Sequence, residues 1–175
     1  MPSFSIQVQD EEVQSLLKRL AEKLGDLQPA LQAIGDDMVE RTKARFDISP
    51  VGQAPDGTPW KANAPSTLAA WLGSGYRKKS GDLNAAGLRR LATKRPLIGK
   101  SGDLRRQIVA RASSNELVVG ASPVYAAIHQ FGGQAGRGRK VTIPARPFLP
   151  IRLDGTLCPQ ERTKIIDAIK DMLLG

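Results

Sequence analysis

The sequence predicts one α+β domain over residues 1–175. An antiparallel sheet, made of a hairpin and additional strands, is expected to pack against two long amphipathic helices, a short central helix and a C-terminal helix. Residues 10–46 carry two stripes of apolar side chains at helical spacing, residues 106–120 have the composition of a β-hairpin, and residues 159–173 return to helical spacing. Helices and an antiparallel sheet in separate parts of the chain are typical of the α+β class. At 175 residues the chain is long enough for one substantial core and short for two.

The chain is predicted to begin with a short strand and a helix. Phe4, Ile6 and Val8 alternate with polar residues, which is the pattern of a half-buried strand. Asp10 stands where the N-cap of a helix is expected, and Gly25 stands where the apolar stripe of that helix ends. These two signals bound the first helix.

A second helix is predicted from near Pro29 to about Phe46. It should run antiparallel to the first helix, because only the short stretch 25–28 joins them. Its last turns are rich in cations, which the negative end of the helix dipole favours. The side chains predicted to face inward are Leu31, Ile34, Met38, Val39, Thr42 and Phe46.

The middle of the chain is predicted to be irregular. Residues 48–58 are rich in Pro, Gly and Asp and form a loop that delivers Trp60 to the core or to an interface. A short helix through Trp71 follows. Residues 73–95 form a basic insertion that we expect to be poorly ordered in the isolated protein. Because long loops are rare without a role, we expect this insertion to become ordered against a partner.

A β-hairpin is predicted next. A turn marked by Ser101, Gly102 and Leu104 leads into a strand over about residues 106–112. A second turn, rich in Ser and Asn, leads into the return strand over residues 116–120.

The hairpin enters a short helix around which we expect the domain to be organised. Pro123 suits the first turn of a helix, because its missing N–H has no intrahelical partner there. Gly132 and Gly133 suit the left-handed end of the same helix.

Two faces of this helix are predicted to differ. Val124, Ile128 and Phe131 are spaced to share one face, which should press into the core. Tyr125 and His129, at i and i+4, form a second pair on a flank, where rings can be buried while their polar atoms form hydrogen bonds.

Residues 143–149 cannot be helical, because Pro144 and Pro147 restrict their own φ and that of the residues before them. We predict a stiff extended segment that places the side chain of Phe148 in a hydrophobic site. Arg146 lies within it, and we expect a fixed bidentate contact with an acid of this chain or of a neighbouring subunit.

Two further elements complete the predicted fold. A strand is expected over residues 140–143, and a final helix is expected to open at Pro159. The apolar face of that helix consists of Ile165, Ile166, Ile169, Met172 and Leu173.

The net charge of +9 is concentrated in one segment. Between residues 62 and 111 there are eleven Lys or Arg and only two acids. Such a segment favours a polyanion through counterion release, without sequence specificity, so nucleic-acid binding through residues 77–111 is the alternative function. A solvated loop is the plainer interpretation. The candidate cations are Arg77, Lys78, Lys79, Arg89, Arg90, Lys94 and Arg95, with Arg137, Arg139 and Lys140 of a second, Gly-rich loop.

Nothing in the sequence predicts an enzyme, a metal site or a cofactor. The one histidine cannot supply a multi-histidine metal site, and the one cysteine, Cys158, has no second thiol. His129 has no carboxylate nearby in sequence to orient it as a base. No run approaches the roughly 18 apolar residues of a membrane span, and no secretory signal is visible. We therefore expect no membrane contact and a reducing compartment, the cytoplasm.

The chain resembles the virion morphogenesis (tail completion) family of contractile-tailed, Mu-like phages and prophages. The resemblance spans about residues 30–170 and is most specific in two motifs near the C-terminus. The first motif consists of Tyr125, Ala126, His129, Gln130, Phe131, Gly132 and Gly133. The second motif consists of Pro144, Arg146, Pro147 and Phe148. Weaker matches upstream are Trp60, Ser101, Gly102 and Leu104.

This resemblance implies a structural protein that works by assembly and not by catalysis. It implies a role in tail completion or head–tail joining, within a ring at the neck or tail terminus that is six-fold where a tail tube is concerned. The implied partners are further copies of the chain and other phage tail or neck proteins. Non-specific DNA contact is suggested separately, by the basic segment, and stays an open alternative. The implied location is the host cytoplasm during assembly and then the virion.

Overall fold

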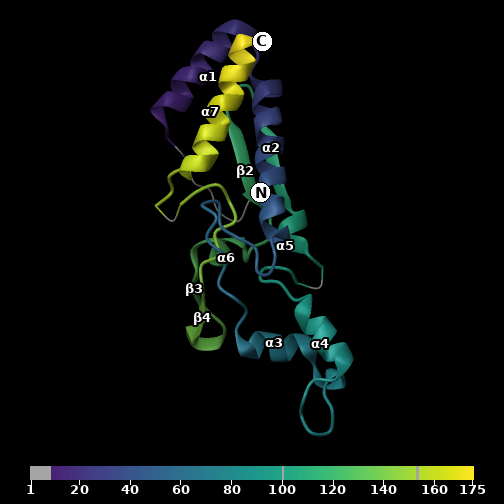
Figure 1. The fold of residues 1–175 in the computed structure, drawn as a ribbon. Coiled ribbons are helices and arrows are strands. Elements are labelled where there is room, and N and C mark those ends of the chain that lie inside the picture. The colour runs from purple at the N-terminus through teal and green to yellow at the C-terminus, as the bar shows by residue number, and fades with distance from the viewer. Residues whose placement is uncertain (1–8, 100, 153) are drawn as a thin grey trace.

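The computed structural model describes residues 9–99, 101–152 and 154–175. The predicted strand at Phe4, Ile6 and Val8 lies outside these residues. The α+β class is confirmed, and the described strands form two separate two-stranded antiparallel sheets. The molecule is elongated, with three long helices at one end and two smaller projections at the other (Figure 1).

The helical end consists of α1 (Glu11–Leu24), α2 (Gln28–Asp47) and α7 (Pro159–Leu174). As predicted, Asp10 caps α1: its Oδ1 accepts a hydrogen bond from the backbone N–H of Val13 at 3.1 Å. Gly25 ends the helix with φ of 73°. α1 and α2 run in opposite directions, and α7 packs along α1 (Figure 1). Their shared core includes Leu16, Leu20, Leu31, Ile34, Ile165 and Ile169.

The predicted hairpin is formed by β1 (Ile108–Ala112) and β2 (Leu117–Ala121), which pack against α2. A helical turn, α5 (Asp103–Arg106), precedes β1, so the strand begins two residues later than expected. Gly35 permits the close approach of α2, because a Cβ at this position would lie 2.8 Å from the Cβ of Ala110.

A second core lies beneath the helical end and is built around three aromatic rings. The centroid of Phe46 lies 5.0 Å from that of Trp60 and 5.7 Å from that of Phe148. All three side chains are buried, as are Leu104 and Ile108 beside them. This core joins α2, the start of β1 and the segment that contains Phe148.

The short helix α6 (Ala126–Phe131) begins later than predicted. The residues after Pro123 form a turn, and Val124 is 89% exposed, so the predicted core face with Val124 is wrong. Because the helix starts at Ala126, its buried face consists instead of Ala126 and Gln130, at i and i+4. Ile128 and Phe131 are only partly buried.

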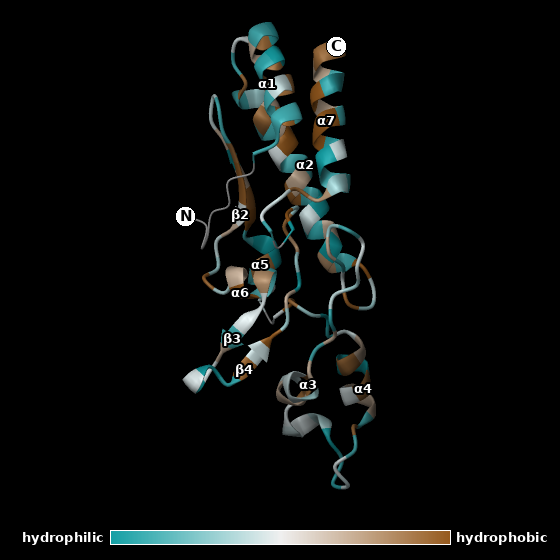
Figure 2. Cartoon of the chain, turned by 90° about the vertical axis from the view of Figure 1, so that its left-hand side faces the viewer, coloured by the Kyte–Doolittle hydropathy of each residue, from teal (hydrophilic) through white to brown (hydrophobic). Residues whose placement is uncertain are grey.

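Two projections extend from the end opposite the long helices. The helical arm (residues 65–92) contains α3 (Pro65–Leu72), the 3-10 turn Ser74–Tyr76 and α4 (Ala85–Ala92). The hairpin arm (residues 133–143) contains β3 (Gly133–Ala135) and β4 (Val141–Ile143). Figures 1 and 2, seen 90° apart, both show the two arms separated from α1 and α7 by the rest of the molecule.

The helical arm has internal packing of its own. Asn84 caps α4 by accepting a hydrogen bond from the backbone N–H of Gly87 at 2.8 Å. Gly87 lies so close to Tyr76 that a Cβ would come within 2.6 Å of the Tyr76 carbonyl oxygen. The expected mobility of residues 73–95 stays a prediction, although the segment has these defined elements.

Candidate functional site

The proline segment (residues 144–151) is held against α6 by the side chain of Gln130. Its Oε1 accepts hydrogen bonds from the backbone N–H groups of Phe148 at 2.9 Å and Leu149 at 3.0 Å. Its Nε2 donates to the carbonyl of Ile151 at 3.5 Å. The side chain is fully buried, so this one amide satisfies backbone groups that would otherwise lack partners in the core.

Gly132 permits the proline segment to pass directly beside the end of α6. Its φ is 74°, and a Cβ there would lie 2.8 Å from the backbone nitrogen of Ala145. The carbonyl of His129 accepts a hydrogen bond from the backbone N–H of Arg146 at 2.8 Å in the same region. Gly133 then pairs with Ile143 and begins the hairpin arm. The predicted glycine end of the helix is therefore confirmed.

Gly132→Ala should cost more stability than the matched change Gly73→Ala. Both glycines have nearly the same backbone conformation, with φ of 74° and 67° and ψ of 179° and 178°. No atom of the described residues lies within 4 Å of a Cβ built at Gly73, so that change adds backbone strain alone, about 1–3 kcal/mol. The clash at Gly132 should add about 1–3 kcal/mol more. Urea unfolding measures both, and equal losses would contradict the close approach.

Arg146 connects the proline segment to the stem of the helical arm. Its Nε donates to the carbonyl of Lys61 at 2.7 Å, and its Nη2 donates to the carbonyl of Ala62 at 3.0 Å. The expected contact with an acid of this chain is wrong for the described residues, because Nε and Nη2 donate to backbone carbonyls and no carboxylate of those residues pairs with Arg146. Beside it, Trp60 Nε1 donates to the carbonyl of Pro147 at 2.8 Å. Arg146 and Trp60 thus fix the point at which the chain leaves the body for the helical arm.

The other stem of the helical arm is fixed as well. Arg95 Nη1 donates to the carbonyl of Asp47 at 2.7 Å, and Pro96 is fully buried. Lys94 Nζ donates to the carbonyl of Ile98. Both ends of the arm are therefore attached to the body by hydrogen bonds that sequence spacing could not reveal.

A buried ionic cluster connects α2, α7 and the proline segment. Glu161 is 3% exposed, and its carboxylate contacts Arg45 Nη2 at 2.6 Å and Arg41 Nε at 3.1 Å. Arg45 Nη1 also donates to the carbonyl of Phe148 at 2.7 Å. Burial lowers the pKa of Arg45, and the charge of Glu161 opposes that shift. Sequence reasoning missed this cluster, because the helix dipole alone accounts for cations near the end of α2.

Tyr125 and His129 form the predicted pair. Their ring centroids lie 5.8 Å apart with the planes at 79°. His129 Nδ1 is buried and has no hydrogen-bond partner among the described residues. Burial, and then the charge of Arg146, lower the pKa of His129 below its ordinary value, so the ring is neutral at pH 7.

The stability of the protein should decrease as the pH falls below the ordinary histidine pKa of 6.5. A pKa that is lower in the folded state means that the unfolded chain binds the proton more readily, so acid favours unfolding. His129 is the one histidine in the chain, which makes the effect assignable. Urea unfolding should show that the free energy of unfolding falls less between pH 7.5 and pH 5.5 in His129→Gln than in the wild type. Equal losses would contradict the shifted pKa.

The candidate cations differ in their contacts. Arg90 stacks over Trp71 at 4.5 Å and over Tyr76 at 4.9 Å, and Lys94 lies over Trp71 at 4.5 Å. With Arg95, these cations belong to the arm and its stem. Arg77 is exposed and donates to the carbonyl of Gly81 at 2.8 Å. The remaining cations are exposed. Lys78 and Lys79 lie in the turn before α4, Arg89 lies within α4, and the turn of the hairpin arm carries Arg137, Arg139 and Lys140.

Three further positions singled out in the sequence have local roles. Gly102 has φ of 66° at the turn before α5, and Ser101 Oγ contacts the Asp103 carboxylate. Cys158 is buried, and burial raises the pKa of its thiol. Within residues 9–99, 101–152 and 154–175, no three His, Cys, Asp or Glu side chains are grouped as metal ligands. None of the helices in those ranges has the length and apolar character needed to cross a bilayer.

Comparison with known proteins gives a consistent result. A family model described as the phage virion morphogenesis family matches residues 8–174. The chain is 32% identical over 161 residues to Mu-like prophage FluMu G protein 2 of Haemophilus influenzae, covering 92% of this chain and 88% of that protein. It is 28% identical over 168 residues to putative capsid assembly protein G of Escherichia phage Mu, covering 89% and 94%. No solved structure matches the chain.

Proposed function

Because this chain belongs to the phage virion morphogenesis family, we propose that it is a structural subunit that completes the tail or joins it to the head. Copies of the chain form a ring, hexameric where it meets a tail tube, at the neck or the tail terminus. The neighbours of each copy are other copies and other tail or neck proteins. The chain is assembled in the host cytoplasm and stays in the virion.

The observation that carries this proposal is that three motif residues bind other segments of the same chain and hold them in place. Gln130, Arg146 and Trp60 are buried and direct their polar atoms to backbone groups of this chain. Their hydrogen bonds fix the proline segment and one stem of the helical arm. The interior therefore sets the position of two projecting arms, which is what a subunit needs if it contacts neighbours.

The two ends of the molecule are built from different elements, which suits the head-to-tail contacts of a ring. Subunits in a ring meet head to tail, so one surface of each copy must fit a different surface of the next. One end consists of α1, α2 and α7, and the other carries the helical and hairpin arms (Figure 1). The name of the phage Mu relative, a putative capsid assembly protein, also supports an assembly role.

Electron microscopy of particles produced without the chain tests this proposal. We expect free heads, free tails or tails of irregular length in place of complete virions, with complete virions restored by supplying the wild-type chain. Normal virions in its absence would overturn the proposal. Free heads with normal tails would favour head–tail joining, whereas tails of irregular length would favour tail completion.

Nucleic-acid binding is a second candidate function, favoured by the exposed positive charge of the two arms. Lys78, Lys79 and Arg89 on the helical arm are exposed, as are the three cations of the hairpin arm. None of the six has an ion-pair partner in the described ranges. Cations without acidic partners are suited to phosphate groups, and binding through them would be independent of sequence.

The triple variant Lys78→Gln, Lys79→Gln, Arg89→Gln should weaken duplex DNA binding if this second function holds. The slope of log K against log salt should become shallower by about 0.9 for each phosphate that the variant no longer neutralises. A matched variant, Lys18→Gln, Arg19→Gln, Lys164→Gln, removes the same charge from the helical end and should leave the slope unchanged. Fluorescence anisotropy measures binding by both variants. Equal effects would indicate that DNA binding depends on the net charge of the protein and not on the cations of the helical arm.

A further inference from the structure

The tip of the helical end (residues 20–28 and 167–175) has an exposed apolar surface. Leu24, the last residue of α1, is 47% exposed, and Leu174, the last residue of α7, is 87% exposed. The two helix ends lie together, because Lys23 Nζ donates to the Leu173 carbonyl at 2.9 Å. Exposed leucines on neighbouring helix ends are typical of a surface that contacts a partner.

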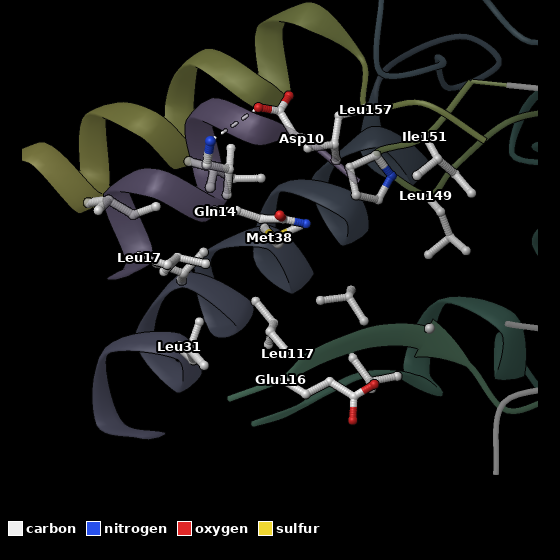
Figure 3. A pocket seen from close by; sticks show the side chains of 18 of the residues that line it. Asp10, Gln14, Leu17, Leu31, Met38, Glu116, Leu117, Leu149, Ile151 and Leu157 are labelled. Atoms are coloured by element: carbon white, nitrogen blue, oxygen red, sulfur yellow. Dashed lines mark hydrogen bonds between the residues drawn. The ribbon is translucent and has the colours of Figure 1, made fainter. Parts of the chain in front are cut away.

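The tip is separate from the apolar groove of the helical end. That groove has a volume of about 630 Å³ and lies between α1, α2 and β2. Figure 3 shows Leu17 and Leu31 toward one end of it and Leu157 toward the other. Neither Leu24 nor Leu174 is among the described residues that line it. A partner at the tip therefore does not need to enter the groove.

Acids accompany the exposed leucines of the tip. The tip contains four acids and two lysines, and none of the four carboxylates forms an ion pair within the described residues. Asp167 and Asp171 are one turn apart on α7, and Leu174 follows Asp171 by one more turn, so the three share one face of the helix. The tip therefore presents apolar side chains beside negative charge that is available to a partner.

The helical arm presents apolar side chains beside the opposite charge. Leu88 of α4 is 58% exposed, and Ala85 and Ala92, one turn away on the same face, are exposed as well. The arm contains five Lys or Arg and one acid, and none of the five cations forms an ion pair within the described residues. Residues 1–8, 100 and 153 add no Asp or Glu to the chain. The positive charge of the arm is therefore available to an acidic partner.

We propose that the helical arm of one copy docks on the tip of the next copy. The two surfaces are complementary, because each combines exposed leucine with charge of the sign that the other lacks. They lie at opposite ends of an elongated molecule, so they can meet only between two copies (Figures 1 and 2). A contact between two different surfaces is head to tail and repeats from copy to copy until a ring closes. This inference rests on the proposed function, since it names the contact through which the ring forms.

Charge reversal in the purified full chain tests the proposal, with self-association measured by sedimentation equilibrium up to about 1 mM. Reversal of either surface alone should weaken self-association about tenfold or more, because like charges then face each other. Reversal of both surfaces in one chain keeps the wild-type net charge and should restore self-association. The arm changes are Lys78→Glu, Lys79→Glu and Arg89→Glu, and the tip changes are Glu22→Lys, Asp167→Lys and Asp171→Lys.

A matched reversal elsewhere on the body is the control. Glu11, Asp36 and Glu116 are exposed acids without an ion-pair partner in the described ranges, and Glu116 borders the groove (Figure 3). Their replacement by lysine changes the net charge as the tip variant does and should leave self-association unchanged. Three results would overturn the proposal: a wild-type chain that stays monomeric, a double reversal as weak as either single reversal, or equal effects of the tip and control variants.

Disulfide cross-linking keeps the test valid if the reversed variants do not fold. Cys158 is buried, so cysteines introduced at exposed positions react selectively. Leu24→Cys with Leu88→Cys should give a ladder of covalent multimers on mild oxidation, because each copy then joins two others. Val124→Cys with Leu88→Cys, in which the first cysteine lies at an exposed position outside the tip, should give no ladder.

The absence of a ladder in the first pair, or equal ladders in both pairs, would overturn the docking of the arm on the tip. That failure would leave the role in virion assembly standing, because the contact is measured without virions. Normal virions in the absence of the chain would instead overturn the role.

Discussion

Replacement of Gln130 by leucine is expected to lower the free energy of unfolding by about 3–5 kcal/mol. The change leaves the backbone N–H groups of Phe148 and Leu149 buried without an acceptor, and each such group costs about 1–3 kcal/mol. Leucine has a similar volume, so the loss reports the missing amide and not a cavity. Urea unfolding followed by circular dichroism measures the change.

Gln134→Leu is the matched control for this prediction. Gln134 lies in β3 with an exposed side chain, and among the described residues its Oε1 accepts from Thr142 Oγ1 alone, at 3.3 Å. A surface change of this kind should stay within about 0.5 kcal/mol. If Gln130→Leu costs no more than Gln134→Leu, the amide does not hold the proline segment in place.

Glu161→Ala is expected to cost about 3–5 kcal/mol, because it leaves the guanidinium of Arg45 buried without its counter-charge. The packing of the proline segment should be disturbed as well, since Arg45 donates a hydrogen bond to the Phe148 carbonyl. Near-ultraviolet circular dichroism, to which Phe46, Trp60 and Phe148 contribute with the other aromatic residues, should change together with the unfolding free energy.

Glu40→Ala removes the same kind of side chain from the surface of α2. Its carboxylate pairs with Lys43 at 3.2 Å and is 74% exposed, so the change should cost at most about 1 kcal/mol. Similar losses from Glu161→Ala and Glu40→Ala would mean that the buried cluster contributes no more than a surface ion pair.

Local signals were sufficient to predict most elements of the fold. Asp10 and Gly25 bound α1, turn residues bound the hairpin of β1 and β2, and Pro159 opens α7, as expected from the sequence. Each of these signals acts over a few neighbouring residues. The boundary of α6 was missed because the turn after Pro123 delays the helix, which moves the buried face from Val124 to Ala126 and Gln130.

The site depends on contacts that sequence spacing does not reveal. Arg45 and Glu161 are 116 residues apart in the chain, and Arg146 reaches carbonyls 84 and 85 residues away. A carbonyl acceptor leaves no mark in the sequence, because every residue has one. For this reason Arg146 could be singled out as a fixed charge, although its partner could not be identified.

The central claim is that the chain is a structural part of the finished virion. Quantitative mass spectrometry of purified complete virions tests it most directly, with a known capsid protein as the internal standard. We expect the chain to be present in a small, fixed number of copies per particle, as a single ring requires, and to remain bound after washing with high salt. Absence of the chain from complete virions would contradict the claim.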